Sequence, residues 1–324
     1  MPRSLFTLLL APLAILAIKS NAAELAYPVK PVRVIAPSSP GSGIDFVGRF
    51  VAQGLTDSTD QQFIVDNRAG AGGNIGAEVA AKAAPDGYTL FLGTSTHVIN
   101  VSLYKRLSYD FVRDFAPISR LTNGFYVIVV HPSVPVKNVK ELIALAKARP
   151  GQLNFASAGN GNATHLAGEL FKSIARVDIV HVPYKGTGPA LVDLVSGQVQ
   201  LMFSNFTAAL PHFKSGKLRA LAVTSERRTP SAPEIPTVTE SGLPGYSVTS
   251  WYGLVAPART PQPIIAKLNS EIVKVLKQPG IGDRLAADGA EPAPDTPAEF
   301  EALIKSELAK WQKVIKKAGL ADSL

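Results

Sequence analysis

The sequence predicts an α/β protein with mainly parallel sheets arranged in two lobes. Short apolar strands alternate with amphipathic helices along most of the 324 residues, a pattern typical of parallel strands connected by helices. Two of these strands, at residues 32–36 and 154–157, run into loops rich in Gly, Ser and Asn from which a helix begins. A chain of about 300 residues exceeds the size at which a single hydrophobic core stops growing, so we expect two lobes.

The chain begins with the features of a secretory signal peptide. Arg3 precedes an apolar run over residues 5–18, and small residues follow at 20–23. A membrane-spanning helix needs about 20 apolar residues, so this run indicates a cleaved signal peptide, residues 1–22, rather than an uncleaved anchor. No later segment approaches the spanning length. We therefore expect the mature protein to be exported and soluble.

Three strand–loop–helix units begin the first lobe. Their strands are expected at residues 32–36, 62–66 and 88–92, which are short apolar runs that end in glycine-rich or serine-rich segments. The helix after the first strand begins near Asp45, and its apolar residues repeat at helical spacing up to Leu55. The second strand is followed by an alanine-rich helix that ends before Pro85.

Two β-forming runs are expected to cross between the lobes. The first covers residues 125–130 and the second covers residues 247–255, which include Trp251. They place lobe 1 at residues 27–125 and 253–324, and lobe 2 at residues 126–252. Lobe 2 is expected to hold helices at 139–148, from Thr164 and at 189–197, and strands at 154–157, 179–182, 198–203 and 218–224. Helices at 263–276 and 297–318 complete the chain.

Every glycine-rich loop follows the carboxyl end of an expected strand. These loops cover residues 40–45, 69–76, 93–97, 157–165, 184–188 and 204–205. In open α/β sheets, ligands bind just outside this edge, where helix N-termini present unpaired N–H groups and partial positive charge. We therefore predict a site that holds a small anion with backbone amides and short hydroxyls. For any single loop, the alternative that its glycines only form a tight turn stays open.

Three side chains in these loops have two interpretations each. His97 and His165 both lie at the start of a helix, where each could face the pocket or could cap and pack against its helix. Lys185 could bind an anion or could be a solvated loop cation.

Composition and sequence motifs argue against several other classes of protein function. The chain has no cysteine, which excludes disulfides, thiolate metal sites and a cysteine nucleophile. It has no P-loop and no Gly-x-Ser-x-Gly, and Ile75 breaks the dinucleotide fingerprint. The five histidines are scattered, so we predict no metal, no cofactor and no enzymatic activity. The net charge of +8 becomes +6 when Arg3 and Lys19 leave with the signal peptide, and basic residues without interleaved aromatics predict no nucleic-acid partner.

An ordered set of short motifs resembles one family of receptors. The motifs are Tyr27-Pro28, Pro40-Gly41-Ser42-Gly43-Ile44-Asp45, Asn67-Arg68-Ala69-Gly70-Ala71-Gly72-Gly73, Pro85-Asp86-Gly87-Tyr88-Thr89-Leu90, His165-Leu166-Ala167-Gly168-Glu169, Val182-Pro183-Tyr184-Lys185-Gly186, Pro236-Thr237 and Trp251-Tyr252-Gly253. In this order, from about Tyr27 to the C-terminus, they resemble the Bug (TctC) family, the extracytoplasmic solute receptors of tripartite tricarboxylate transporters.

The resemblance implies a type II periplasmic binding protein whose two lobes are joined by two crossing strands and close on a small carboxylate. It implies that loops of lobe 1 hold one carboxylate while the other end of the ligand faces lobe 2. Asp45 is expected to order the first loop and cap its helix. The expected ligand-binding residues are Ser39, Pro40, Gly41, Ser42, Gly43, Ala71, Gly72, Gly73, Thr94, Ser95, Thr96, His97, Ser157, Ala158, Gly159, Asn160, Thr164, His165, Tyr184, Lys185, Ser204 and Asn205.

Two departures from the family pattern bear on the ligand. Where the family commonly has Pro-Gly-Gly, this chain has Pro40-Gly41-Ser42, which adds a hydroxyl to the first loop. Where the family usually has an aspartate after the Met-Phe of strand 199–203, this chain has Ser204. An aspartate there would suit an ammonium group, so we expect a ligand without a cationic end, such as a dicarboxylate or an aromatic carboxylate.

The resemblance also implies a place and a partner. It implies a periplasmic receptor, expected to be a monomer, that serves the membrane components of a tripartite tricarboxylate-type transporter. Two alternatives stay open: a receptor that is read by a membrane kinase, and a secreted hydrolase or isomerase that uses His97 or His165 as a base.

Overall fold

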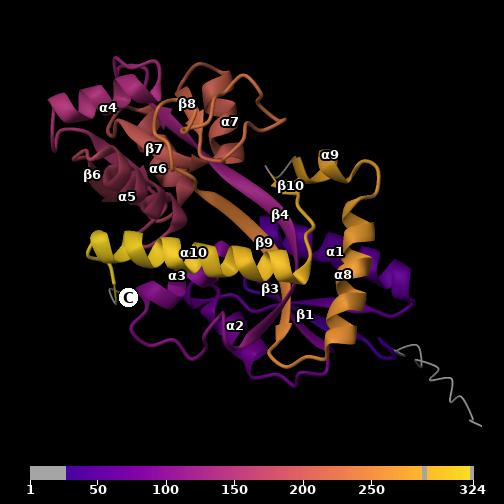
Figure 1. The fold of residues 1–324 in the computed structure, drawn as a ribbon. Coiled ribbons are helices and arrows are strands. Elements are labelled where there is room, and N and C mark those ends of the chain that lie inside the picture. Colours follow the sequence, from indigo (N-terminus) through magenta and orange to yellow (C-terminus); the bar gives the residue numbers. More distant parts are fainter. Residues whose placement is uncertain (1–26, 287–289, 322–324) are drawn as a thin grey trace, which may run out of the picture.

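The structure, a computed structural model, describes residues 27–286 and 290–321. The signal peptide predicted at residues 1–22 lies outside the described residues. Figure 1 shows two groups of strands and helices joined by two long strands, β4 (Phe115–Val130) and β9 (Thr249–Pro257). Within the two described ranges, no helix is long and apolar enough to cross a membrane.

Lobe 1 is the lower group in Figure 1 and contains the N-terminal strands. Besides β9 and the first part of β4, its strands are β1 (Val32–Ala36), β2 (Phe63–Asn67), β3 (Thr89–Thr94) and β10 (Ala290–Pro292). Its helices are α1 (Gly43–Thr59), α2 (Asn74–Ala81), α3 (Ser95–Leu103), α8 (Gln262–Leu276) and α9 (Ile281–Ala286), with the 3-10 turn η1 (Ala71–Gly73).

Lobe 2 is the upper group and repeats the alternation of strands and helices. Besides the second part of β4, its strands are β5 (Asn154–Ser157), β6 (Val180–Pro183), β7 (Leu201–Asn205) and β8 (Arg219–Val223). Its helices are α4 (Val139–Ala148), α5 (Ala163–Ala175), α6 (Thr187–Val195) and α7 (Phe206–Lys214).

The predicted α/β fold is confirmed, and its sheet is mixed. The strand order is β2-β1-β3-β9-β4-β7-β5-β6, with β8 and β10 also pairing with β4. β1 is parallel to β2 and β3, and β5 is parallel to β6 and β7, as the strand–helix alternation predicts. β4 and β9 are antiparallel to their neighbours. β4 pairs with β9 as far as Phe125 and with β7 from Tyr126, so one strand runs through both lobes.

Apolar side chains pack on both faces of the sheet. In lobe 1, α1 and α8 cover one face, while α2, α3 and the last helix, α10 (Pro297–Lys317), pack on the other. In lobe 2, α4 and α5 cover one face and α6 and α7 the other. α10 contributes to both lobes, because Phe300 packs in lobe 1 and Trp311 packs in the lobe 2 core. Figure 1 shows α10 running along the joint between the two groups.

Candidate functional site

The loop before α1 brings hydroxyl groups and free amides together. Ser42 is the N-cap of α1: its Oγ accepts a hydrogen bond from the Asp45 amide at 3.4 Å and lies 2.6 Å from Ser38 Oγ. The amides of Gly43 and Ile44 lie in the first helical turn, where no intrahelical acceptor exists. Ser39, Pro40 and Gly41 are exposed. An anion placed at this helix start would therefore meet N–H donors and the positive end of the helix dipole.

Asp45 was expected to cap this helix, but the N-cap is Ser42, and the Asp45 carboxylate instead bonds to the loop and to its neighbours. Its carboxylate accepts hydrogen bonds from the Gly41 amide at 2.8 Å, from Asn67 Nδ2 at 2.8 Å and from Arg49 Nε at 3.1 Å. Burial alone would raise the pKa of Asp45, but hydrogen bonds from Arg49, Gly41 and Asn67 lower it below its usual value. Asp45 is therefore a carboxylate at neutral pH, and its negative charge is already matched by donors of the protein.

The second glycine-rich loop has an unusual backbone. Four consecutive residues have positive φ: Gly70 at 127°, Ala71 at 48°, Gly72 at 66° and Gly73 at 95°. Glycine adopts this region freely, whereas an alanine there costs roughly 1–2 kcal/mol. The turn leads into α2, whose first residues have no side-chain cap. The turn itself supplies acceptors there, because the Gly73 amide donates to the Gly70 carbonyl at 2.9 Å and the Asn74 amide donates to the Ala71 carbonyl.

His97 lies beneath this loop as part of the wall. Its Nδ1 accepts a hydrogen bond from the Thr94 amide at 3.0 Å and so caps α3. Burial lowers the pKa of His97 to about 4, so the ring is neutral at physiological pH. A Cβ placed on Gly73 would lie 2.8 Å from His97 Nε2 and 3.1 Å from Pro37 Cβ. The loops after β1, β2 and β3 therefore meet at Gly73, as the sequence pattern predicts.

Gly73→Ala should consequently disturb the site of lobe 1. The methyl group would press on His97 and Pro37 and would force a strained φ, so we expect at least tenfold weaker carboxylate binding and about 1–3 kcal/mol lower stability. Calorimetric titration and urea unfolding measure the two effects. Gly216→Ala is the matched control, since Gly216 has φ +74° but open space at its Cβ position. Equal effects of the two changes would show that the contacts at Gly73 do not matter.

The corresponding loop of lobe 2 is stabilised by its own side chains. Asn162 Oδ1 accepts from the Thr164 amide at 3.0 Å and caps α5. Thr164 Oγ1 accepts from the Ala158 amide at 2.9 Å, and Ser157 Oγ accepts from the Gly159 amide at 3.1 Å. Ser157, Thr164 and the neighbouring His165 are buried. Their polar atoms thus shape the loop, while Asn160 is exposed at its tip.

Tyr184 and Lys185 border this loop from the next strand. The amide of Tyr184 donates to the Ser157 carbonyl at 3.1 Å, and the Gly186 amide donates to the Ala158 carbonyl at 3.1 Å. The Tyr184 hydroxyl instead donates to Asp193 Oδ2 at 2.8 Å. Burial, together with Asp193, raises the pKa of Tyr184 to about 12. Lys185 is exposed, so in this structure the backbone of the segment supports the loop.

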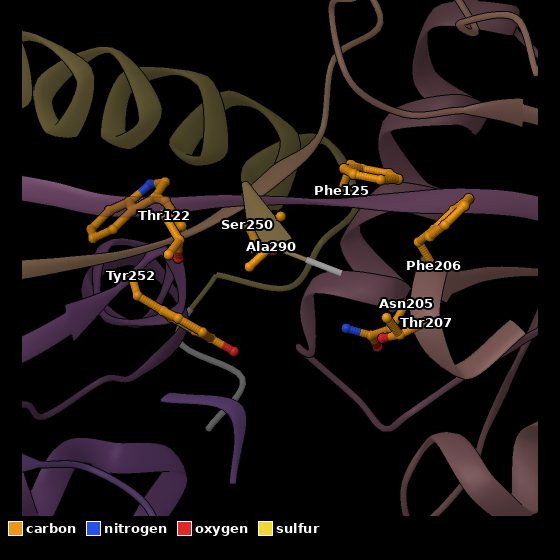
Figure 2. A pocket seen from close by; sticks show the side chains of 10 residues that line it. Thr122, Phe125, Asn205, Phe206, Thr207, Ser250, Tyr252 and Ala290 are labelled. Carbon is orange, nitrogen blue, oxygen red and sulfur yellow. The ribbon is translucent and has the colours of Figure 1, made fainter. Parts of the chain in front are cut away.

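A small pocket lies where the crossing strands meet the end of β7. It is lined by Thr122, Gly124, Phe125, Asn205, Phe206, Thr207, Ser250, Trp251, Tyr252 and Ala290. Figure 2 shows the Tyr252 hydroxyl, from β9, pointing across the opening toward the side chain of Asn205 on lobe 2. Phe125 and Phe206 lie side by side in its wall, with ring centroids 4.8 Å apart. The cavity holds about 50 Å³, which is room for a few water molecules.

This pocket, named the hinge pocket because it lies at the crossing strands, is lined by one of the predicted ligand-binding residues, Asn205. Ser204 is fully buried, and its hydroxyl donates to the Asn205 carbonyl at 3.2 Å. The first loop reaches the pocket through Tyr252, because a Cβ on Gly43 would lie 3.4 Å from the Tyr252 hydroxyl. The other predicted residues of lobe 1 and lobe 2 lie outside its lining.

Several lining residues were missed by the sequence reasoning. Phe125, Ser250 and Tyr252 belong to the two crossing strands, and Phe206 and Thr207 begin α7. α7 has no side-chain cap, so its first amides are a further set of free donors beside the pocket. The predicted positions of the crossing strands could have indicated these residues, because a strand that joins two lobes lies beside the space between them.

The chemistry of these elements suits anion binding better than catalysis. Helix starts in both lobes, those of α1, α6 and α7, supply N–H donors. No cluster of metal-ligating side chains occurs within residues 27–286 and 290–321. His97 and His165, the two candidate bases, are both buried, and each accepts a backbone amide at Nδ1. Their pKa values are lowered, chiefly by burial, to about 4 and about 3. Neither ring offers the accessible acceptor that a general base needs.

Known proteins share this fold. The structure of Rpa4515 from R. palustris with adipate is 37% identical with a TM-score of 0.76, covering 91% of this chain and 99% of that one. MatC (Rpa3494) from Rhodopseudomonas palustris with bound malate is 35% identical with a TM-score of 0.72, covering 89% of this chain and 100% of that one. Protein BugT of Bordetella pertussis is 38% identical over 295 residues, which are 90% of each chain.

The fold is thus that of a periplasmic solute-binding receptor. Residues 47–320 match the tripartite tricarboxylate transporter family receptors, TctC, and the chain belongs to this family. The resemblance to the Bug (TctC) family that the sequence motifs suggest is confirmed.

Proposed function

We propose that the protein is exported to the periplasm by a cleaved signal peptide, traps a small carboxylate between its lobes and delivers it to the membrane components of a tripartite tricarboxylate-type transporter. The family of the chain supports the receptor role, and it supports the transporter partner by the family's own description. The receptor is proposed to act as a monomer, because closure needs free movement of the lobes. Ligand binding would then shift an open–closed equilibrium without chemical change.

The absence of charge in the hinge pocket supports a specific class of ligand. None of the ten lining residues is acidic or basic, so an ammonium group would be desolvated there without a partner. Asp45, the buried carboxylate of the first loop, is already matched by donors of the protein. Phe125 and Phe206 add apolar surface. We therefore favour a dicarboxylate or an aromatic carboxylate, and the adipate and malate of the two solved relatives fit this class.

The proposed movement is a hinge at the crossing strands. Lobe 1 is proposed to comprise residues 27–125 and 253–324, and lobe 2 residues 126–252. The first crossing lies where β4 changes partners, between Phe125 and Tyr126. The return crossing lies near Val248, whose amide donates to the Thr224 carbonyl of lobe 2 at 2.9 Å. Since the hinge pocket alone holds about 50 Å³, the ligand would also occupy the space that the loops of both lobes enclose on closure.

A thermal-shift screen of the mature protein tests the proposal. The screen contains di- and tricarboxylates, aromatic acids, acidic amino acids and nicotinate-like heteroaromatics. A compound at about 100 times its Kd should stabilise the protein by roughly 2.7 kcal/mol, and we expect this for amine-free carboxylates. Binding of acidic amino acids with no response to plain carboxylates would contradict the proposed ligand class. Turnover of any acid in the screen would contradict the receptor role itself.

A further inference from the structure

Two histidines of lobe 2 form a stacked pair beneath the loop of residues 157–162. His165 of α5 and His181 of β6 have ring centroids 3.7 Å apart and planes inclined by 8°. His165 is 4% exposed, and His181 is half-buried. Neither ring lines the hinge pocket. The pair therefore contacts the loop without being part of the pocket wall.

Each ring is bonded to a different part of that loop. His165 Nδ1 accepts a hydrogen bond from the Gly161 amide at 3.1 Å, so the proton of this neutral ring is on Nε2. His181 Nε2 lies 2.6 Å from Ser157 Oγ, which also lies 3.1 Å from the Gly159 amide and 3.2 Å from the Gly159 carbonyl. A hydroxyl has one proton, so all three contacts are hydrogen bonds only if His181 Nε2 donates to Ser157 and Ser157 donates to the carbonyl.

We propose that the stacked His165–His181 pair is a positioning device, which fixes the ligand-binding loop 157–162 without touching the ligand. The pair engages the amides of Gly159 and Gly161, one through Ser157 and the other directly. The amides of Asn160 and Ala163 have no acceptor among the described residues. This inference rests on the proposed function in one respect, that loop 157–162 faces the carboxylate.

The positioning requires uncharged rings. Protonation of His165 would add a proton at Nδ1. Both Nδ1 and the Gly161 amide would then be donors, and the hydrogen bond between them would be lost. The charged groups around the pair are Glu169 and Lys172: Glu169 Oε1 lies 3.8 Å from His165 Nε2 and 2.9 Å from Lys172 Nζ. Burial, then His181 and Lys172, lower the pKa of His165 to about 3, and burial, then Lys172, lower that of His181 to about 4.

The sign of the resulting pH dependence follows from these lowered values. The unfolded chain takes up protons near pH 6.5, whereas the folded rings resist protonation until about pH 4 and below. Stability from the pair is therefore fully present above about pH 6.5 and is lost as the pH falls toward the folded values. In the folded protein the two rings therefore stay uncharged well above pH 4.

The test compares His165→Leu with His165→Asn by amide hydrogen exchange in the ligand-free protein. Asparagine Oδ1 can take the place of Nδ1 as acceptor, and leucine cannot. We expect at least tenfold faster exchange of the Gly161 amide in H165L and at most threefold in H165N. H181M and H181Q provide the same contrast at Gly159, in case H165L fails to fold. Equal exchange in the leucine and asparagine variants would overturn the positioning role.

Two further readouts complete the test. The combined variant H165N/H181Q should lose less stability than wild type between pH 6.5 and pH 5, whereas an unchanged pH profile would overturn the neutral-pair inference. Titration with adipate examines the loop's role in binding, and H165L should bind at least tenfold more weakly than H165N. Fast exchange in H165L combined with equal adipate affinities, or with no adipate binding in any variant, would support the positioning and contradict the proposed ligand site.

Discussion

Replacing Trp311 with alanine is expected to lower the free energy of unfolding by about 3–5 kcal/mol, the usual range for removing a buried tryptophan. Trp311 is 1% exposed and packs in the core of lobe 2, although its helix α10 begins against lobe 1. Its Nε1 donates to Glu307 Oε2 at 2.8 Å. The alanine variant therefore loses the indole contacts, leaves a cavity and removes a donor from a buried carboxylate.

Urea unfolding and thermal melting of the mature protein measure this loss, and the melting temperature should fall on the order of 10 °C. Trp311→Phe should lose less, because it keeps most of the apolar contact and gives up the hydrogen bond. Gln312→Ala is the matched control, since Gln312 is the next residue of the same helix and is exposed. A loss below about 1 kcal/mol for W311A would contradict the packing of the distal half of α10 on lobe 2.

The packing of Trp311 in the core of lobe 2 could not have been predicted from the sequence. Helical periodicity predicts a helix at 297–318, and the structure confirms it as α10, Pro297–Lys317. Periodicity identifies the apolar face but not which core receives it, because that depends on how the lobes lie relative to one another. By contrast, the strand at 32–36 and the helix at 263–276 were predicted to within one residue, because the local sequence pattern is enough to determine them.

Two segments with conflicting local signals were not predicted, the first part of β4 and the helix α7. β4 begins at Phe115, ten residues before the predicted strand, and contains Pro117, which normally argues against a strand. The structure accommodates the proline at an irregularity of register between Pro117 and Ser119. α7 has Pro211 in its interior and no side-chain cap at its start. In both cases tertiary packing outweighs the local preference.

The convergence of the loops could be predicted from the sequence, whereas the directions of their side chains could not. Glycine-rich segments after successive strands indicate convergence, and the contacts of Gly73 with His97 and Pro37 show it for lobe 1. The spacing of residues along the sequence does not predict in which direction a loop side chain points. His165, Ser157 and the Tyr184 hydroxyl are occupied by protein partners, whereas Tyr252 and Phe206 at the pocket carried no motif that marks a ligand contact.

Replacing Asp45 with asparagine is expected to weaken carboxylate binding at least tenfold and to lower stability by about 1–3 kcal/mol. The Asp45 carboxylate accepts from three donors, the Gly41 amide, Asn67 Nδ2 and Arg49 Nε. An asparagine has one carbonyl oxygen, so its NH₂ group would face at least one donor and leave it unsatisfied. The first loop would then lose the contact that fixes Gly41 next to the start of α1. Titration with the best carboxylate from the screen and urea unfolding measure the two effects.

Asp57→Asn is the matched control for the asparagine change, because Asp57 is an exposed residue of the same helix, and its carboxylate accepts from Gln53 Nε2 at 2.7 Å. The pH dependence separates the charge of Asp45 from its shape. Since the folded pKa of Asp45 lies below the unfolded value of about 3.9, its contribution is complete above that pH and is lost as the pH falls through the folded pKa. The stability gap between wild type and D45N should therefore be constant from pH 8 to about pH 5 and shrink below about pH 4. A gap that stays constant into acid would mean that the shape of the side chain, and not its charge, holds the first loop.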